Sequence, residues 1–156
     1  MLFLVARPGR TMQSTESEGQ MYDVKRVEYY TTTIEEHVGD ASRLLARIAG
    51  AGVDFFAFRA VRAGPGQVQF SLMATDPQQM TDAAERSGLE LDGPSPALLV
   101  RGDEVPGALA AIYERLARAG VEVRESSGIA HIKGGYGVLL YLASEDREKA
   151  VAALEG

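Results

Sequence analysis

Cysteine is absent from the 156-residue sequence, which excludes disulfides, thiolate catalysis and cysteine-ligated metals. A chain without cysteine fits a reducing compartment, so a cytoplasmic location is expected. Long apolar runs are also missing. The longest, residues 1–6, is far shorter than the roughly 20 residues of a membrane helix and lacks the basic segment that opens an export signal. No membrane association is predicted.

Positive charge is scarce as well. The 16 Lys and Arg residues are outnumbered by 22 Asp and Glu, giving a net charge of −6 and a pI near 5.0. Proteins that wrap a phosphate backbone need a basic face, and no Lys/Arg cluster occurs here. A nucleic-acid partner is therefore not expected.

Catalytic and metal-binding patterns are missing too. The sequence has no "GxSxG" elbow and no His paired with a nucleophile and an acid, so the protein is not expected to be an enzyme. His131 has no Asp, Glu or His at ligand spacing, so no metal site is predicted. The "GGYG" segment at 134–137 lies between two predicted strands rather than between a strand and a helix. It is predicted to be a turn, and no cofactor is expected.

What the sequence does contain is a repeat. The stretch "EHVGDASRLLARIAGAGVDF" at residues 36–55 returns as "EVPGALAAIYERLARAGVEV" at residues 104–123, 68 positions later and without a gap. Each copy carries apolar residues at i, i+3, i+4 and i+7, typical of an amphipathic helix of about three turns. Each has a Gly at the helix entrance and another just past its end, where a left-handed cap is favoured. The apolar positions are Ala41, Leu44, Leu45 and Ile48 in the first copy, and Leu109, Ile112, Tyr113 and Leu116 in the second.

Strands and a second helix follow in each copy. "VDFFAFRAV" and "VQFSLMA" alternate with period two and flank "AGPG", which predicts a hairpin. The second copy has "KGGYG" before "VLLYLA" at the corresponding place. Asp76 followed by Pro77 predicts the start of a helix that ends at Gly88, and its counterpart starts near Ser144. A strand at Leu89–Leu91 is predicted to lead through "DGPSP" to a strand at 97–101.

The predicted fold class is α+β. The order strand, helix, strand, strand, helix, strand gives a ferredoxin-like unit, with an antiparallel sheet and both helices on one face. Residues 22–95 and 96–156 are predicted to form two such units after a disordered leader at 1–21. The second unit lacks its last strand, so its exposed edge must be covered by the segment around Tyr22–Tyr30, by the sister unit or by another subunit.

Across residues 24–154 the chain resembles a tandem pair of ACT domains, regulatory modules that commonly bind amino acids. The resemblance rests on helix entrances of the form acid-x-Pro-Gly, here "EVPG" at 104–107 and "EHVG" at 36–39, where Val38 replaces the usual Pro. It implies an amino-acid ligand, a homodimer and a partner enzyme or regulator. It also implies that each pocket is closed by the second strand of an adjacent module, which corresponds to Phe55 and Val123.

The chemistry of the entrance is consistent with that ligand. A Gly at a strand-to-helix junction allows a ligand to approach the backbone, and the free N–H groups of the helix start attract a carboxylate. The neighbouring acid, Glu36 or Glu104, is placed to take an ammonium group. The predicted ligand-binding residues are Glu36, His37, Val38, Gly39, Asp40 and Phe55 in the first copy, and Glu104, Val105, Pro106, Gly107, Ala108 and Val123 in the second.

Two hypotheses follow for the function. The leading one is a non-catalytic regulatory protein that senses an amino acid or a similar zwitterion where ACT-like units meet. The alternative is a ligand-free interaction or dimerisation module that regulates a partner enzyme. On that reading the glycines only permit tight strand–helix packing, and the two glutamates are solvated carboxylates that favour the helix dipole.

Overall fold

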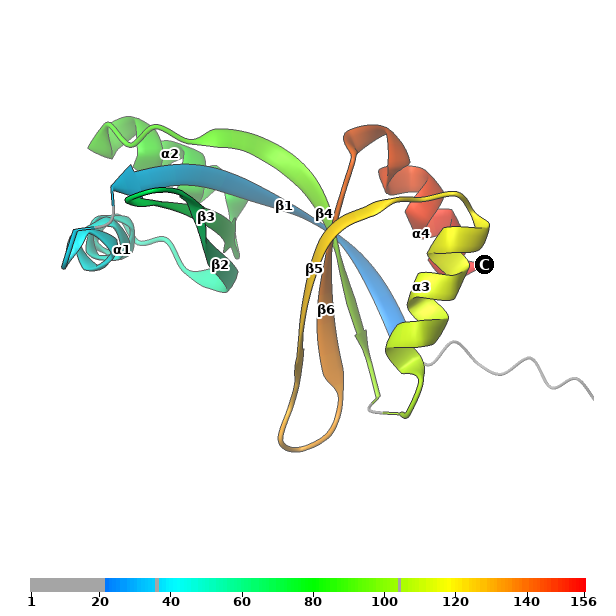
Figure 1. The fold of residues 1–156 in the computed structure, drawn as a ribbon. Coiled ribbons are helices and arrows are strands. Elements are labelled where there is room, and N and C mark those ends of the chain that lie inside the picture. The colour runs from blue at the N-terminus through cyan, green and yellow to red at the C-terminus, as the bar shows by residue number, and fades with distance from the viewer. Residues whose placement is uncertain (1–21, 36, 104) are drawn as a thin grey trace, which may run out of the picture.

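The computed structural model describes residues 22–35, 37–103 and 105–156. Within them the chain forms one six-stranded antiparallel sheet in the order β2-β3-β1-β4-β6-β5, together with four α-helices (Figure 1). The elements are β1 (Tyr22–Glu35), α1 (Asp40–Gly50), β2 (Phe55–Gly64), β3 (Gln67–Ala74), α2 (Pro77–Ser87), β4 (Asp92–Gly102), α3 (Ala108–Arg118), β5 (Val123–Ala130), β6 (Tyr136–Leu142), a 3₁₀ turn (Ser144–Asp146) and α4 (Arg147–Glu155).

Two long strands, β1 and β4, are shared by both halves of the molecule (Figure 1). The C-terminal part of β1 pairs with β3, and its N-terminal part pairs with β4, starting at Tyr22 opposite Gly102. We call α1, α2, β2 and β3, with the adjoining parts of β1 and β4, the first unit; the remainder is the second unit. The strand that the second unit lacked is therefore supplied by β1, which confirms one of the three expected ways to cover that edge.

One predicted strand was wrong. Leu89–Leu91 is not a strand; the side chains of Leu89 and Leu91 pack against the core of the first unit instead. β4 begins at Asp92 and runs straight through the "DGPSP" segment that had been taken for a connection. This part of β4 pairs only with β1, as an outer strand, so the N–H that Pro94 lacks costs no hydrogen bond there.

The helices cover one face of the sheet. On β1, Tyr22 and Val24 pack in the core beneath α3 and α4, while Tyr30 and Ile34 pack in the core beneath α1 and α2. All four positions are even-numbered, and alternate residues of a strand point to the same face. Both helix pairs therefore lie on the same side, as the ferredoxin-like prediction requires.

The opposite face curls over itself and is also partly buried. A third apolar cluster there combines Val27, Met73, Ala97 and Tyr141 from four different strands. Arg59 of β2 forms an ion pair with Glu125 of β5, and its guanidinium carbon lies 5.8 Å from the centre of the Tyr141 ring. The two outermost strands of the sheet are thus joined through side chains, which holds the two units together.

Candidate functional site

The two glycine entrances have the same backbone geometry. Gly39 and Gly107 are the N-cap residues of α1 and α3, with φ of 91° and 88°. In each loop the first helical N–H donates to the carbonyl three residues back, from Asp40 to His37 and from Ala108 to Val105, both at 3.1 Å. Such positive φ values are readily adopted only by Gly, which explains why both copies place a Gly at this point.

Neither entrance is capped by a described side chain. The carboxylate of Asp76, by contrast, caps α2 by accepting hydrogen bonds from the N–H groups of Gln78 and Gln79. At the start of α3, the N–H groups of Leu109 and Ala110 have no partner among the described residues. These donors point out of the positive end of the helix and favour an anion.

The first entrance is occupied by its own side chains. A Cβ added to Gly39 would lie 3.1 Å from a guanidinium nitrogen of Arg43, which is paired with Asp40. The ring nitrogen Nδ1 of His37 lies 3.0 Å from the Asp40 carboxylate. Arg43, followed by His37, holds the pKa of the Asp40 carboxyl below its usual value. An ion pair therefore already occupies this helix start, and a ligand would have to displace Arg43 to reach it.

The second entrance is open. Ala108 and Ala111 replace Asp40 and Arg43 at the 68-residue offset, and a Cβ added to Gly107 would meet none of the described residues within 4 Å. A cavity of about 400 Å³ lies beside it, between the start of α3 and the β5–β6 hairpin. Its described lining is Val105, Gly107, Ala108, Leu109, Ala110, Gly128, Ile129, Ala130, Tyr136 and Val138. We call this space the gate cavity.

One polar group lines the gate cavity and one acid lies close to it. Tyr136 is paired with Gly102 across the sheet, so Asp103 follows directly at the same end. Burial raises the pKa of the Tyr136 hydroxyl, and the negative charge of Asp103 adds to that rise. Asp103 is thus a carboxylate at the same end of the sheet as the gate cavity.

The remaining predicted site residues lie in several places. Glu36 and Glu104 fall outside the described residues. Val38 is fully exposed, Val105 is 40% exposed, and Pro106 is exposed. The side chains of Phe55 and Val123 pack against the cores of their own units, so within one chain neither closes the entrance of the sister unit.

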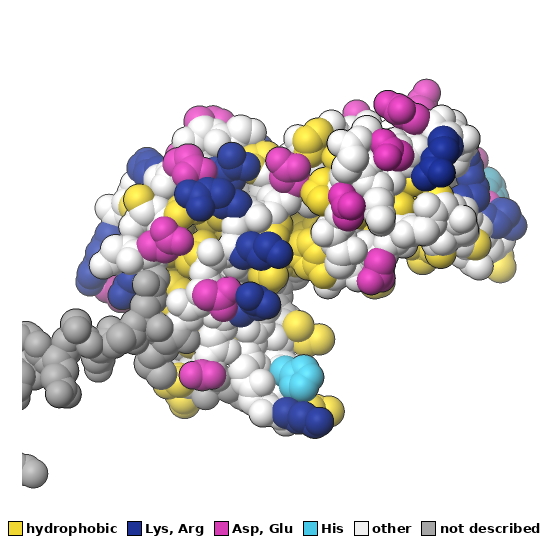
Figure 2. Space-filling view, turned by 180° about the vertical axis from the view of Figure 1, so that it is seen from behind, with side chains coloured by type: hydrophobic (Ala, Val, Ile, Leu, Met, Phe, Trp, Pro, Cys, Tyr) yellow, Lys and Arg dark blue, Asp and Glu magenta, His cyan; other side chains and the backbone are white. Residues whose placement is uncertain are grey.

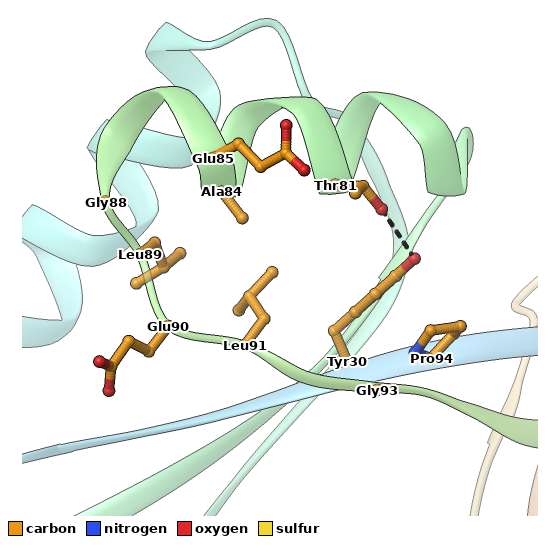
Figure 3. A pocket seen from close by; sticks show the side chains of 10 residues that line it. All are labelled: Tyr30, Thr81, Ala84, Glu85, Gly88, Leu89, Glu90, Leu91, Gly93 and Pro94. Carbon is orange, nitrogen blue, oxygen red and sulfur yellow. Dashed lines mark hydrogen bonds between the residues drawn. The ribbon is translucent and has the colours of Figure 1, made fainter.

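A further cavity, of about 540 Å³, lies beneath α2 in the first unit (Figure 3). Its apolar walls come from Leu89, Leu91 and Ala84, and Glu85 extends over it from the helix. The hydroxyl groups of Tyr30 and Thr81 are hydrogen bonded at 3.1 Å at one end. None of its described lining residues belongs to either glycine entrance.

Hydrophobic side chains also gather where the two units meet (Figure 2). A cleft of about 410 Å³ lies there, with Phe56 and Phe58 of β2 on one wall and Ile129 and Leu139 of the β5–β6 hairpin on the other. Ile129 lines this cleft as well as the gate cavity, so β5 separates the two spaces.

Among the described residues, no group of three or more His, Cys, Asp or Glu side chains is arranged to hold a metal ion. Across the same part of the chain, none of the helices has the length and apolar character needed to cross a membrane.

No protein-family model and no curated protein matches the sequence. Solved structures do match. Protein BT0572 from Bacteroides thetaiotaomicron superposes with a TM-score of 0.73 at 15% identity, over 85% of this chain and 88% of that one. The ligand-free regulatory subunit of aspartate kinase from Thermus thermophilus gives 0.61 at 16% identity, over 86% and 94%. Such regulatory subunits are tandem ACT domains. The chain has the tandem ACT fold.

A third match, to the aspartokinase alpha and beta subunits, has a TM-score of 0.59 at 17% identity and covers 86% of this chain and 94% of that one. At such low identities the likeness establishes the architecture alone. The tandem ACT fold places both glycine entrances at equivalent positions, and the side chains that fill or line them differ between the two copies.

Sequence reasoning missed part of the gate cavity. Leu109 was identified only as a helix position expected to face the core, yet it is 51% exposed. Ile129, Tyr136 and Val138 come from the β5–β6 hairpin, more than 20 residues after Gly107. The usable signal was the repeat itself, because aligning the copies shows alanines in the second entrance where the first has Asp40 and Arg43.

Proposed function

We propose that this protein is a non-catalytic regulatory module that binds an amino acid, or a similar zwitterion, at the second glycine entrance. The observation that carries the proposal is the space at Gly107, which none of the described residues fills. Beside it lies a cavity of about 400 Å³, where the N–H groups of Leu109 and Ala110 have no partner in that part of the chain. A ligand carboxylate accepts from these two amides. Its ammonium group lies towards Asp103 and the predicted partner Glu104.

The first entrance takes no ligand in this proposal, because Arg43 and Asp40 occupy it. One chain therefore binds one amino acid. The fold that this chain shares with regulatory subunits of aspartate kinase supports a partner enzyme as the protein that it regulates. Occupancy acts by stabilising one relative placement of units or subunits over another. A homodimer and a cytoplasmic location remain part of the proposal.

A thermal-shift screen against the twenty amino acids tests this function. A ligand present at about 100 times its dissociation constant adds roughly 2.7 kcal/mol to the free energy of unfolding. We expect at least one amino acid to raise the melting temperature. If none of the twenty does so, the proposed function is wrong.

A pair of glycine variants locates the site. Gly107→Ala places a methyl group in the open space beside the free amides and should abolish the ligand response. Gly52→Ala is the matched control, because Gly52 also has a positive φ, of 83°, and open space around it. Both substitutions incur similar backbone strain, of about 1–2 kcal/mol. Only the Gly107 variant should lose the response to ligand.

The alternative function, a ligand-free interaction module, is favoured by a different observation. Val105, Leu109 and Tyr113 form an exposed apolar row along α3, next to the outermost strand β5. A row of this kind beside a free strand edge suits another protein chain. Sedimentation analysis distinguishes the alternatives: self-association that persists with no response to any amino acid supports the interaction module.

A further inference from the structure

The lining of the gate cavity indicates which kind of side chain its ligand has, an inference that rests on the proposed function. Its described walls are aliphatic: Val105 and Leu109 come from the α3 side, and Ala130 and Val138 from the hairpin. No charged side chain lines it among the described residues. We infer that the ligand is an amino acid with an apolar side chain, of the kind found in valine, leucine, isoleucine, methionine or phenylalanine.

The cavity beneath α2, a notch beside β1 and the first entrance differ from the gate cavity because charged side chains line them. Glu85 and Glu90 line the cavity beneath α2, and Lys25, Arg26 and Arg147 line a notch of about 380 Å³ beside β1. The first entrance holds Asp40, Arg43 and His37. The gate cavity is thus a place where a helix start with free amides meets walls without charge.

Charge complementarity fixes the orientation of the ligand. The free amides of Leu109 and Ala110 take the carboxylate, and Asp103, which acts on the nearby Tyr136, draws the ammonium group towards the end of β4. With both charged ends held at the helix start, the side chain extends between Leu109 and Val138. No described charged side chain lines the cavity to pair with a charged ligand side chain, whereas an apolar one gains contact with the aliphatic walls.

The exposure of the lining residues supports the same conclusion. Leu109 is 51% exposed and Val105 is 40% exposed, so both offer apolar surface that a ligand would remove from water. A hydrophobic pocket distinguishes ligands that differ by one methylene by about tenfold or more. We therefore expect leucine to bind at least about tenfold more tightly than alanine, and lysine, aspartate and serine to bind more weakly than leucine.

Isothermal titration of the full chain with L-leucine, L-phenylalanine, L-alanine, L-serine, L-lysine and L-aspartate tests the inference. Leu109→Ser should raise the dissociation constant for leucine about tenfold, since it replaces apolar wall with a hydroxyl. The matched control is Ile132→Ser, because Ile132 is fully exposed in the β5–β6 hairpin and is not among the described residues that line the cavity. That variant should bind leucine as the unmodified protein does.

The outcomes separate this inference from the proposed function. If lysine, aspartate or serine binds best and Gly107→Ala abolishes that binding, the site is correct and the apolar selectivity is wrong. If leucine binds but Leu109→Ser leaves its dissociation constant unchanged, the assigned wall is wrong. If no amino acid binds, the proposed function fails and the inference fails with it.

Discussion

The sharing of β1 and β4 predicts that damage to one unit destabilises the other. Leu98 of β4 is fully buried in the core of the second unit, in the same cluster as Ile112 and Leu140. Leu98→Ala removes apolar contacts and leaves a cavity that the surrounding structure fills only partly. Substitutions of this type cost about 2–5 kcal/mol, a large part of the 5–15 kcal/mol that stabilises a typical domain.

Because β1 and β4 continue from one unit into the other, we expect this loss to be felt in both. Urea unfolding followed by far-ultraviolet circular dichroism should give one transition with a lowered midpoint. Hydrogen exchange should accelerate for the most protected amides of β3, in the first unit, as well as for those of β6. Leu109→Ala is the control, because the side chain is half exposed, and it should cost less than about 1 kcal/mol.

A loss of protection confined to the second unit would contradict this coupling. If the β6 amides lose protection while the β3 amides exchange as before, the units unfold independently. The shared strands would then not couple them, and an effect of ligand in the second unit on the first would have no structural basis.

Three further predictions concern stability. Asp76→Ala removes the cap of α2 and should cost about 1 kcal/mol, measured by urea unfolding; an unchanged midpoint would argue against the cap. Arg59→Ala removes both the Glu125 ion pair and the contact with the Tyr141 ring and should cost about 1 kcal/mol, and an equal loss in Glu125→Ala would mean that the ring contact adds nothing. Arg26 lowers the pKa of Glu148 from 4.5 to about 2. Their pairing should therefore stabilise the fold fully above pH 4.5, and this stabilisation should be lost as the pH falls towards 2. The difference in unfolding midpoint between the unmodified protein and Arg26→Ala should shrink over that range, and a constant difference would contradict the assignment.

Much of the fold was predictable because the repeat fixes local structure twice. The glycines at 39 and 107 mark the entrances of α1 and α3, and Asp76 marks the start of α2, as the sequence indicated. Leu89–Leu91 misled because leucines that fill a core beside a helix have the same pattern as those of a short buried strand. The sequence left three possibilities for what covers the exposed edge of the second unit, because pairing between β1 and β4 depends on tertiary structure.

The candidate site was less predictable than the fold. Spacing placed both glycines correctly, but the filling of the first entrance depends on the direction that the Arg43 side chain takes towards Asp40. The wall of the gate cavity depends on how the β5–β6 hairpin lies against α3, a contact between segments far apart in the sequence. These features follow from packing, which the periodicity of a single strand or helix does not contain.

The central claim is that the free amides at the start of α3 receive the carboxylate of an amino acid. The most direct test is a ¹⁵N–¹H NMR titration of the full chain with L-leucine, in which the amide resonances of Leu109 and Ala110 are followed. We predict that these two resonances move and saturate together, while those of Ala41 and Ser42 at the first entrance stay in place. Saturable shifts confined to the first entrance or to the cavity beneath α2, with Leu109 and Ala110 unmoved, would contradict the claim.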